Sequence, residues 1–104
     1  MIKILGYDYT VISNEDIANM GAWGRCHQPS LTIHIANDLV QQQLESTLLH
    51  EIIEAINTAL ELGLQENCIM SLEASLYQVF RDNGVSLEPL LIAAGIKNRK
   101  DIDR

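Results

Sequence analysis

The hydrophobic period of the sequence changes near residue 38, and this change constrains the fold more than any other feature. From about residue 38 to residue 83 the apolar residues recur at helical spacing, almost without a break. Before residue 36 the chain is rich in Ile, Val, Tyr and Thr, with turn-forming residues between short runs. Strands followed by helices predict an α+β domain.

We expect the strands to form a small antiparallel sheet. Residues 2–12 are predicted to be one strand, interrupted by a bulge at Gly6. Residues 22–27 and 31–36 are predicted to be two strands joined by a turn, because Leu31, Ile33 and Ile35 alternate with polar residues. A short turn is expected to start at residues 14–16.

Three helices are predicted after the sheet. The first begins at Leu39 or Val40, capped by Asn37 or Asp38, and ends at Gly63, where a left-handed cap is common. The second returns antiparallel from about Gln65 to Asp82, and Asn83-Gly84 ends it. The third is short, from Ser86 to Ala94, with Gly95 after it. We expect residues 1–84 to form a single domain and residues 85–104 to be a weakly attached C-terminal segment, a short helix plus a charged tail.

Composition excludes several classes of function. The chain of 104 residues suits one domain. Its seven basic and fourteen acidic residues give a net charge of −7, which disfavours binding to nucleic acid. No run is long and apolar enough for a membrane span, and the first residues do not resemble a secretory signal, so we expect a cytoplasmic protein without a membrane partner. Two cysteines outside any Cys-x-x-Cys pair do not indicate a disulfide framework.

The candidate chemistry lies in the first helix, where His50-Glu51-x-x-Glu54 differs at one position from the His-Glu-x-x-His zinc motif. In that motif, ligands one turn apart face the same ion, and the glutamate next to the first ligand activates a water molecule as a general base. A third ligand must come from another element. Glu73 lies at the edge of the apolar stripe of the second helix, formed by Ile69, Leu72, Leu76, Val79 and Phe80, so its carboxylate is expected at the helix interface and needs a partner. A metal shared with His50 and Glu54 would provide one.

A simpler interpretation of the same residues is a solvated helix face. Polar residues occupy one side of the first helix, and every amphipathic helix has such a side, whatever its function. The polar residues on that side are Gln43, Ser46, Thr47, His50, Glu54, Asn57 and Glu61. Glu66 also has a sufficient structural reason to be acidic, since it stands at the N-terminus of the second helix. His27 and His34 are expected at the surface of the sheet.

The strand at 31–35, the motif helix at 47–56 and the segment at 76–83 together resemble the small phage and prophage proteins of the zincin-like metallopeptidase group, of ImmA/IrrE or SprT type. The resemblance covers about residues 20–84, and residues 47–56 are its most specific part. It implies a minimal zincin-like fold, with His50 as a zinc ligand, Glu51 as the general base and Glu73 as the third ligand. The sequence departs from the pattern at Glu54, where the group has its second histidine.

This departure affects the chemistry that the resemblance implies. Three carboxylates, from Glu51, Glu54 and Glu73, carry a charge of −3 beside a divalent ion, which should raise the pKa of a bound water. Such a set suits a harder ion, such as Mn²⁺ or Mg²⁺, better than a histidine-rich site does. We expect His50, Glu54 and Glu73 to hold the ion, Glu51 to take a proton from water, and Tyr77 or a backbone group to stabilise the oxyanion.

Three functions follow from these observations. The first is a metal-dependent hydrolase, a peptidase acting on a peptide or protein substrate. The second is an inactive zincin-like protein that serves as a binding or regulatory module of phage or prophage origin. The third is a small acidic protein in which the motif is accidental. In zincins an edge strand aligns an extended peptide, and residues 31–35 are the expected strand here.

Overall fold

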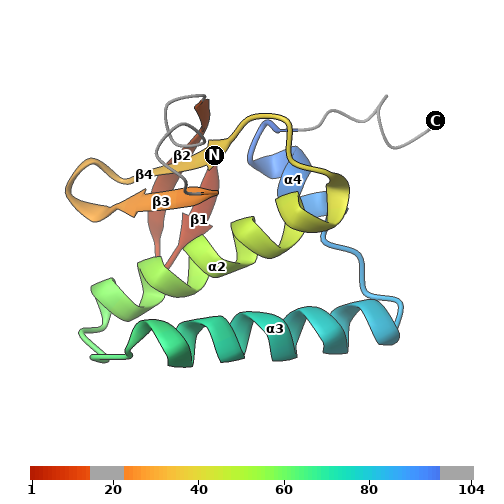
Figure 1. Ribbon diagram of the computed structural model, residues 1–104. Helices are drawn as coiled ribbons and strands as arrows, with labels where there is room; N and C mark the ends of the chain where they lie inside the picture. Colours follow the sequence, from red (N-terminus) through yellow and green to blue (C-terminus); the bar gives the residue numbers. More distant parts are fainter. Residues whose placement is uncertain (15–22, 97–104) are drawn as a thin grey trace.

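The computed structural model describes residues 1–14 and 23–96, and the fold has three layers. A four-stranded sheet forms the first layer, helix α2 packs on it, and helix α3 packs on the far side of α2 (Figure 1). The predicted α+β class is confirmed. The second half of the turn predicted at residues 14–16 and the charged tail from residue 97 lie outside the described residues. In the described part of the chain, no helix is both long and apolar enough to cross a membrane.

The first two strands form a hairpin rather than one bulged strand. Strand β1 (Ile2–Ile4) pairs antiparallel with β2 (Tyr7–Asn14), with Ile2 opposite Tyr9. The two residues between them, Leu5 and Gly6, have φ angles of 51° and 84°. Two consecutive positive φ angles are typical of the tightest hairpin turns, which reverse the chain. The predicted bulge at Gly6 is therefore wrong.

The sheet is mixed, and the prediction of a purely antiparallel sheet is wrong. Strands β3 (Gly24–His27) and β4 (Thr32–Ala36) pair antiparallel as expected, across the short 3-10 turn η1 (Gln28–Ser30). However, the order is β1-β2-β4-β3, and β4 runs parallel to β2. The physical reason is burial, because the central position goes to the strand that carries Ile33 and Ile35, which are almost fully buried. The more polar strand, with exposed Arg25 and His27, stays at the edge.

The main core lies between the sheet and α2, and α4 closes it. Ile33 and Ile35 of β4 join Ile2, Ile4 and Tyr9 of the hairpin in one buried cluster with Leu48 and Ala55 of α2. Helix α4 (Glu88–Ala93) adds Leu91, whose exposed fraction is 0%. The short third helix is thus present as predicted, but it is part of this core rather than weakly attached, because burying its leucine removes apolar surface from water.

Helix α2 spans Gln41–Ala59 and is shorter than predicted at both ends. Asp38 has a φ of 64° and belongs to the preceding turn, and Val40 occupies the N-cap position without a side-chain hydrogen bond. At the other end Glu61, not Gly63, takes the first left-handed position, with a φ of 51°. The Leu62 amide donates to the Asn57 carbonyl at 3.1 Å, which is the Schellman pattern that ends a helix.

Helix α3 spans Glu66–Asp82, close to its predicted bounds. It is rotated about its own axis relative to the packing that its apolar stripe predicts. Ile69 is its only buried residue, and it packs with Leu49 and Ile53 of α2. Tyr77 and Phe80 pack against the same cluster, whereas Leu72, Leu76 and Val79 are exposed by 37–46%. The face toward α2 is therefore centred nearer Glu73 than the apolar stripe indicates.

Candidate metal centre

His50 lies at the centre of a group of carboxylates contributed by α2 and α3. Its Nε2 atom is 3.0 Å from Oε1 of Glu66 and 3.6 Å from Oε1 of Glu54. Its Nδ1 atom is 2.9 Å from Oε1 of Glu73. The side chains of His50 and Glu54 are only 16% and 27% exposed, so these two residues of the polar side of α2 are largely covered rather than fully solvated.

Local structure explains why these side chains meet. Glu54 follows His50 by one helical turn and therefore lies on the same face of α2. Asn57 fixes the return of the chain, because its Oδ1 atom accepts from the Leu64 amide at 2.9 Å. Helix α3 then begins at Glu66 and runs back antiparallel, and Glu73 lies two turns further along the same face.

The ligand atoms suited to a single cation belong to His50, Glu54 and Glu66. One atom from each residue lies within 4.8 Å of the other two, which makes this trio the candidate group among the described residues. The predicted set of His50, Glu54 and Glu73 needs one correction: Glu73 contacts the opposite ring nitrogen and is replaced by Glu66. Because an imidazole offers its two nitrogens in different directions, a carboxylate on Nδ1 does not face an ion on Nε2.

Glu73 instead has the geometry of a residue that orients a metal-binding histidine. Such histidines commonly donate their second N–H group to a carboxylate, which fixes the ring orientation and the tautomer. With the proton on Nδ1, His50 donates to Glu73 and directs the Nε2 lone pair toward Glu54 and Glu66. Glu73 therefore lies at the helix interface with a partner, as the sequence predicts, but the partner is the ring of His50.

Glu51 is buried beneath the first residue of strand β3. Glu51 is only 5% exposed. A Cβ atom placed on Gly24 would lie 2.9 Å from Glu51 Oε2 and 2.8 Å from Thr47 Cγ2. The pKa of Glu51 is raised to about 7, chiefly by burial and in part by the charges of the neighbouring carboxylates, while the charge of His50 acts in the opposite direction. A carboxyl group with a pKa near neutrality can both accept and release a proton, as a general base must.

The pKa of His50 is also displaced in the metal-free protein. Burial lowers this pKa, but the hydrogen bond to Glu73 and the charges of Glu51, Glu66 and Glu73 outweigh burial, so the net shift is upward. The imidazolium form is therefore stabilised when no cation is bound. Metal and proton compete for Nε2, because a ligating histidine must be neutral at that atom.

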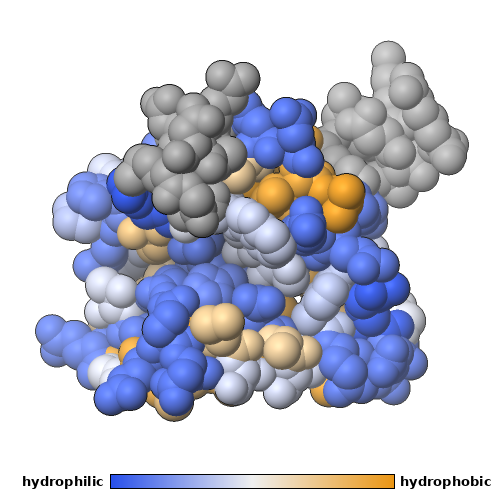
Figure 2. Space-filling view, viewed as in Figure 1, coloured by the Kyte–Doolittle hydropathy of each residue, from blue (hydrophilic) through white to orange (hydrophobic). Residues whose placement is uncertain are grey.

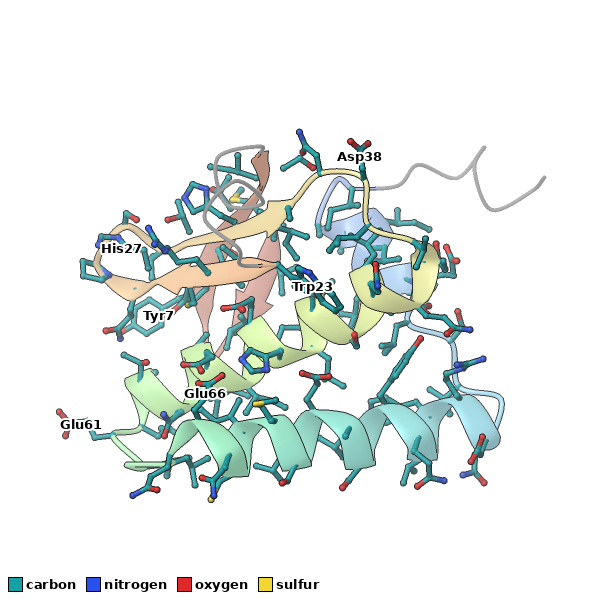
Figure 3. All side chains as sticks on the ribbon, viewed as in Figure 1. Tyr7, Trp23, His27, Asp38, Glu61 and Glu66 are labelled. Carbon is teal, nitrogen blue, oxygen red and sulfur yellow. The ribbon has the colours of Figure 1, made fainter. Side chains whose placement is uncertain are left out.

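A cleft of about 490 Å³ gives access to His50 and Glu66. Figure 3 shows Glu66 at the start of α3 and Trp23 on the sheet side of α2. Figure 2 shows that this side of the molecule is largely hydrophilic, with a pale apolar patch over α3 and a stronger apolar patch near α4 and the start of α2. The cleft is lined by Trp23, Gly24, Ser46, Thr47, His50, Glu51, Glu66, Met70 and Glu73. Glu51, the predicted general base, and His50 thus line the same cavity.

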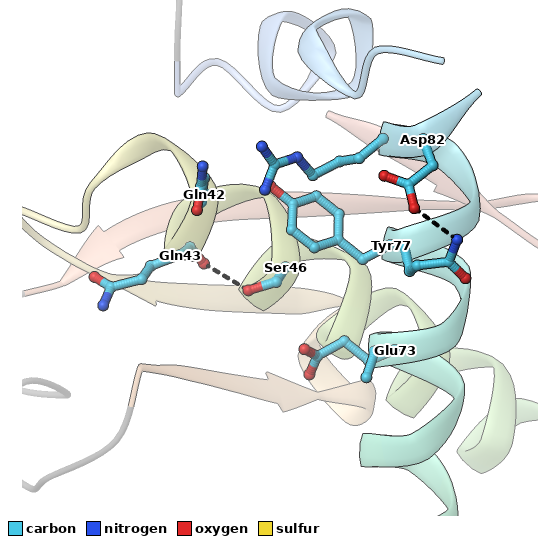
Figure 4. A pocket seen from close by; sticks show the side chains of 9 residues that line it. Gln42, Gln43, Ser46, Glu73, Tyr77 and Asp82 are labelled. Carbon is cyan, nitrogen blue, oxygen red and sulfur yellow. Dashed lines mark hydrogen bonds between the residues drawn. The ribbon is translucent and has the colours of Figure 1, made fainter. Parts of the chain in front are cut away.

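Tyr77 lines a second groove and not the cleft beside His50. This groove, of about 590 Å³, runs between α2 and α3 and shares Ser46 and Glu73 with the cleft (Figure 4). The Tyr77 hydroxyl donates to Glu45 Oε1 at 2.8 Å. Burial, followed by the hydrogen bond to Glu45, raises the pKa of Tyr77 to about 12. The predicted role of Tyr77 as an oxyanion stabiliser therefore has no support in its position.

The strand beside the cleft is also not the predicted one. Strand β4, which contains most of residues 31–35, is paired on both sides and cannot accept another strand. Among the described strands, β3 lies at one edge of the sheet, and its Gly24 lines the cleft. His27 is exposed, and its Nδ1 atom lies 2.7 Å from the hydroxyl of Ser30, away from the metal group. Cys26 is half-buried, and burial followed by the charges of Glu51 and Glu54 raises its pKa to about 11.

Glu66 is the candidate ligand that reasoning from the sequence missed. Its place at a helix N-terminus accounts for an acidic residue without any site. The available signal was its spacing of seven residues from Glu73, which is two helical turns and places both carboxylates on one face of α3. The sequence predicts Glu73 at the edge of the buried face of α3, because the apolar spacing indicates that Leu72, Leu76 and Val79 are buried, whereas all three are exposed.

Comparison with known proteins gives no assignment, since no family model matches the chain and neither the curated proteins nor the solved structures contain a significant match.

Proposed function

We propose that this protein is a metal-dependent hydrolase that cleaves peptide bonds. The observation that carries this proposal is the convergence of His50, Glu54 and Glu66, together with a cleft that His50, Glu66 and the buried Glu51 line. His50, Glu54 and Glu66 would hold a divalent cation. The zincin-like resemblance, a phage or prophage origin and a cytoplasmic location belong to the same proposal.

The donor set fits a divalent cation in charge and in chemistry. The two carboxylates of Glu54 and Glu66 balance a charge of +2, while the imidazole of His50 is neutral when it binds. Imidazole nitrogen and carboxylate oxygen are both ligands of catalytic zinc, and the oxygen-rich composition also suits Mn²⁺. A bound ion of this kind polarises a carbonyl group and makes water more acidic.

The chain's own residues supply the proton transfers. In the proposed reaction, Glu51 accepts a proton from the water whose oxygen forms the new bond to the carbonyl carbon. The carbon–nitrogen bond then breaks, and Glu51 returns that proton to the leaving amine nitrogen. Glu73 holds the His50 ring throughout, and Gly24 leaves room above the Glu51 carboxylate that any larger residue would fill.

A second function, a non-catalytic binding or regulatory module, is favoured by one specific observation. The upward shift in the pKa of His50 means that an imidazolium can satisfy Glu66 and Glu73 without an ion. In that case the cluster is a structural ion-pair network that holds α3 on α2. The two functions differ in whether the purified protein binds a metal.

A measurement of metal binding distinguishes the hydrolase from the non-catalytic module. Chain prepared without a histidine tag and dialysed against EDTA is titrated with Zn²⁺ and with Mn²⁺ by calorimetry. We expect one ion per chain, lost in His50→Ala and Glu66→Ala but retained in Glu61→Ala, which removes an exposed carboxylate from the end of α2. Absence of binding to the unmodified chain would reject the hydrolase and leave the module.

Activity is then measured on a mixture of unstructured peptides by mass spectrometry. New termini are expected with the metal-loaded chain, and their formation should stop in Glu51→Gln, which keeps the size of the side chain but cannot accept the proton. Metal binding by Glu51→Gln is the control, since Glu51 lies outside the proposed ligand trio. Cleavage that persists in Glu51→Gln would remove Glu51 from the mechanism.

A further inference from the structure

Two large apolar side chains stand exposed in the metal cleft, one on each side of α2. Trp23 immediately precedes β3, and Met70 lies on the first half of α3. Both line the cleft, yet Trp23 is 52% exposed and Met70 is 56% exposed. The other lining residues are Gly24, two hydroxyl residues, His50 and three glutamates, so the apolar surface of the cleft is concentrated in these two side chains.

Their positions indicate contact with a ligand rather than packing. Neither residue belongs to the two buried clusters or to the partly buried residues packed against them. A half-exposed tryptophan in a concave site offers a large rigid surface at low entropic cost, and methionine adapts to side chains of different shape. Exposed leucines such as Leu72 also occur on α3, but Leu72 does not line the cleft.

We propose that Trp23 and Met70 form an apolar subsite beside the metal centre and select peptides with a bulky apolar side chain next to the bond to be cleaved. This inference rests on the proposed function, since it names the substrate class of the same site. Glu51, Glu66 and Glu73 line the remaining cleft, in a chain of net charge −7, and repel an acidic side chain at that position. A volume of about 490 Å³ lies within the range of sites that enclose small ligands and accommodates a few residues of a peptide.

The test measures peptide binding without metal and without cleavage. Two fluorescein-labelled pentapeptides, Ala-Ala-Phe-Ala-Ala and Ala-Ala-Asp-Ala-Ala, are titrated with the EDTA-treated full chain, and fluorescence anisotropy gives the dissociation constants. We expect the phenylalanine peptide to bind about tenfold more tightly or better, because a buried aromatic side chain is a typical binding anchor. Trp23 is the single tryptophan of the chain, so its own emission should shift when unlabelled phenylalanine peptide binds.

Matched variants locate the subsite. Met70→Ala is compared with Leu72→Ala, which removes an exposed apolar side chain from the same helix but outside the cleft. Trp23→Ala is compared with Tyr7→Ala, which removes an aromatic side chain of nearly equal exposure, 53%, from strand β2. We expect Met70→Ala and Trp23→Ala each to weaken binding of the phenylalanine peptide about fivefold or more, and the two controls to leave it unchanged. Circular dichroism checks that each variant is folded.

The outcomes are distinct from those of the metal titration. Equal affinity for the two peptides, or loss of binding that is the same in Leu72→Ala as in Met70→Ala, would overturn the apolar subsite even if metal binds. Selective binding of the phenylalanine peptide by a chain that binds no metal would support the subsite and reject the hydrolase.

Discussion

The His50 ring is held between two helices by Glu73, whose Oε1 atom lies 2.9 Å from His50 Nδ1. This contact links residues 23 positions apart and fixes which ring nitrogen faces Glu54 and Glu66. It therefore connects the packing of α3 on α2 with the geometry of the candidate metal centre.

The first prediction follows from this contact. Glu73→Gln keeps the size of the side chain but weakens its attraction for the Nδ1 proton. We expect the affinity for Zn²⁺ to fall by about 10-fold to 100-fold, with one ion still bound per chain. Glu66→Gln, by contrast, removes a proposed ligand and should abolish detectable binding. Equal losses in the two variants, measured by calorimetry, would contradict the separate roles of Glu66 and Glu73.

The second prediction concerns the position at which the sequence departs from the zinc motif. Glu54→His replaces a carboxylate by an imidazole, which Zn²⁺ prefers and Mn²⁺ does not. We expect zinc affinity to rise by about tenfold or more and manganese affinity to fall. Glu61→His is the control, because Glu61 is exposed beyond the end of α2. If both substitutions raise zinc affinity equally, position 54 does not face the ion.

The third prediction is a pH dependence of stability in the metal-free protein. The pKa of Glu51 is raised to about 7 in the fold, chiefly by burial, so between pH 4.5 and 7 the native chain holds a proton that the unfolded chain has released. The contribution of Glu51 to stability is thus present below pH 4.5 and declines as the pH rises to about 7. Relative to the unmodified chain, Glu51→Gln should gain on the order of 3 kcal/mol between these pH values. Urea unfolding at pH 4.5 and pH 8 in EDTA measures this, and a constant difference between the two proteins would refute it.

The fourth prediction tests the close approach of β3 to α2. Gly24→Ala should destabilise the fold by about 1–3 kcal/mol, because the added Cβ meets Thr47 Cγ2 at 2.8 Å and Glu51 Oε2 at 2.9 Å. Thr47→Ser removes that Cγ2 atom. In the Thr47→Ser background the cost of Gly24→Ala should therefore be smaller, as measured by a double-mutant cycle of thermal or urea unfolding. Additive effects would show that the two positions are not in contact.

The fifth prediction concerns Tyr77, which the structure places outside the metal cleft. Its pKa is raised to about 12 by burial and by the hydrogen bond to Glu45, so its contribution to stability is present below pH 10 and is lost as the pH rises to about 12. Tyr77→Phe should remove the phenol that ionises near pH 12 from an absorbance titration at about 295 nm, the phenolate band. The variant should lose about 1 kcal/mol of stability and keep its metal affinity. A large change in metal affinity would return Tyr77 to the site.

The sequence was sufficient for the elements whose signals are local. The helical period predicted α2, α3 and α4 to within a few residues, because this period is a local property of the chain, although it did not predict which face of α3 is buried. Gly84 and Gly95 were correctly placed after α3 and α4, since each has a φ above 70°. The same local pattern identified His50, Glu51, Glu54 and Glu73 as residues of interest, and His50, Glu51 and Glu73 line one cleft.

The tertiary structure decided what depends on contacts between distant segments. The central place of β4 follows from competition between strands for burial, which no single strand encodes. The exchange of Glu73 for Glu66 as the carboxylate on Nε2 follows from the rotation of α3 about its axis, set jointly by Ile69, Phe80 and the Asn57 loop. Since a carboxylate side chain spans only a few ångströms, a modest rotation of one helix determines which glutamate faces Nε2 of His50 and which contacts Nδ1.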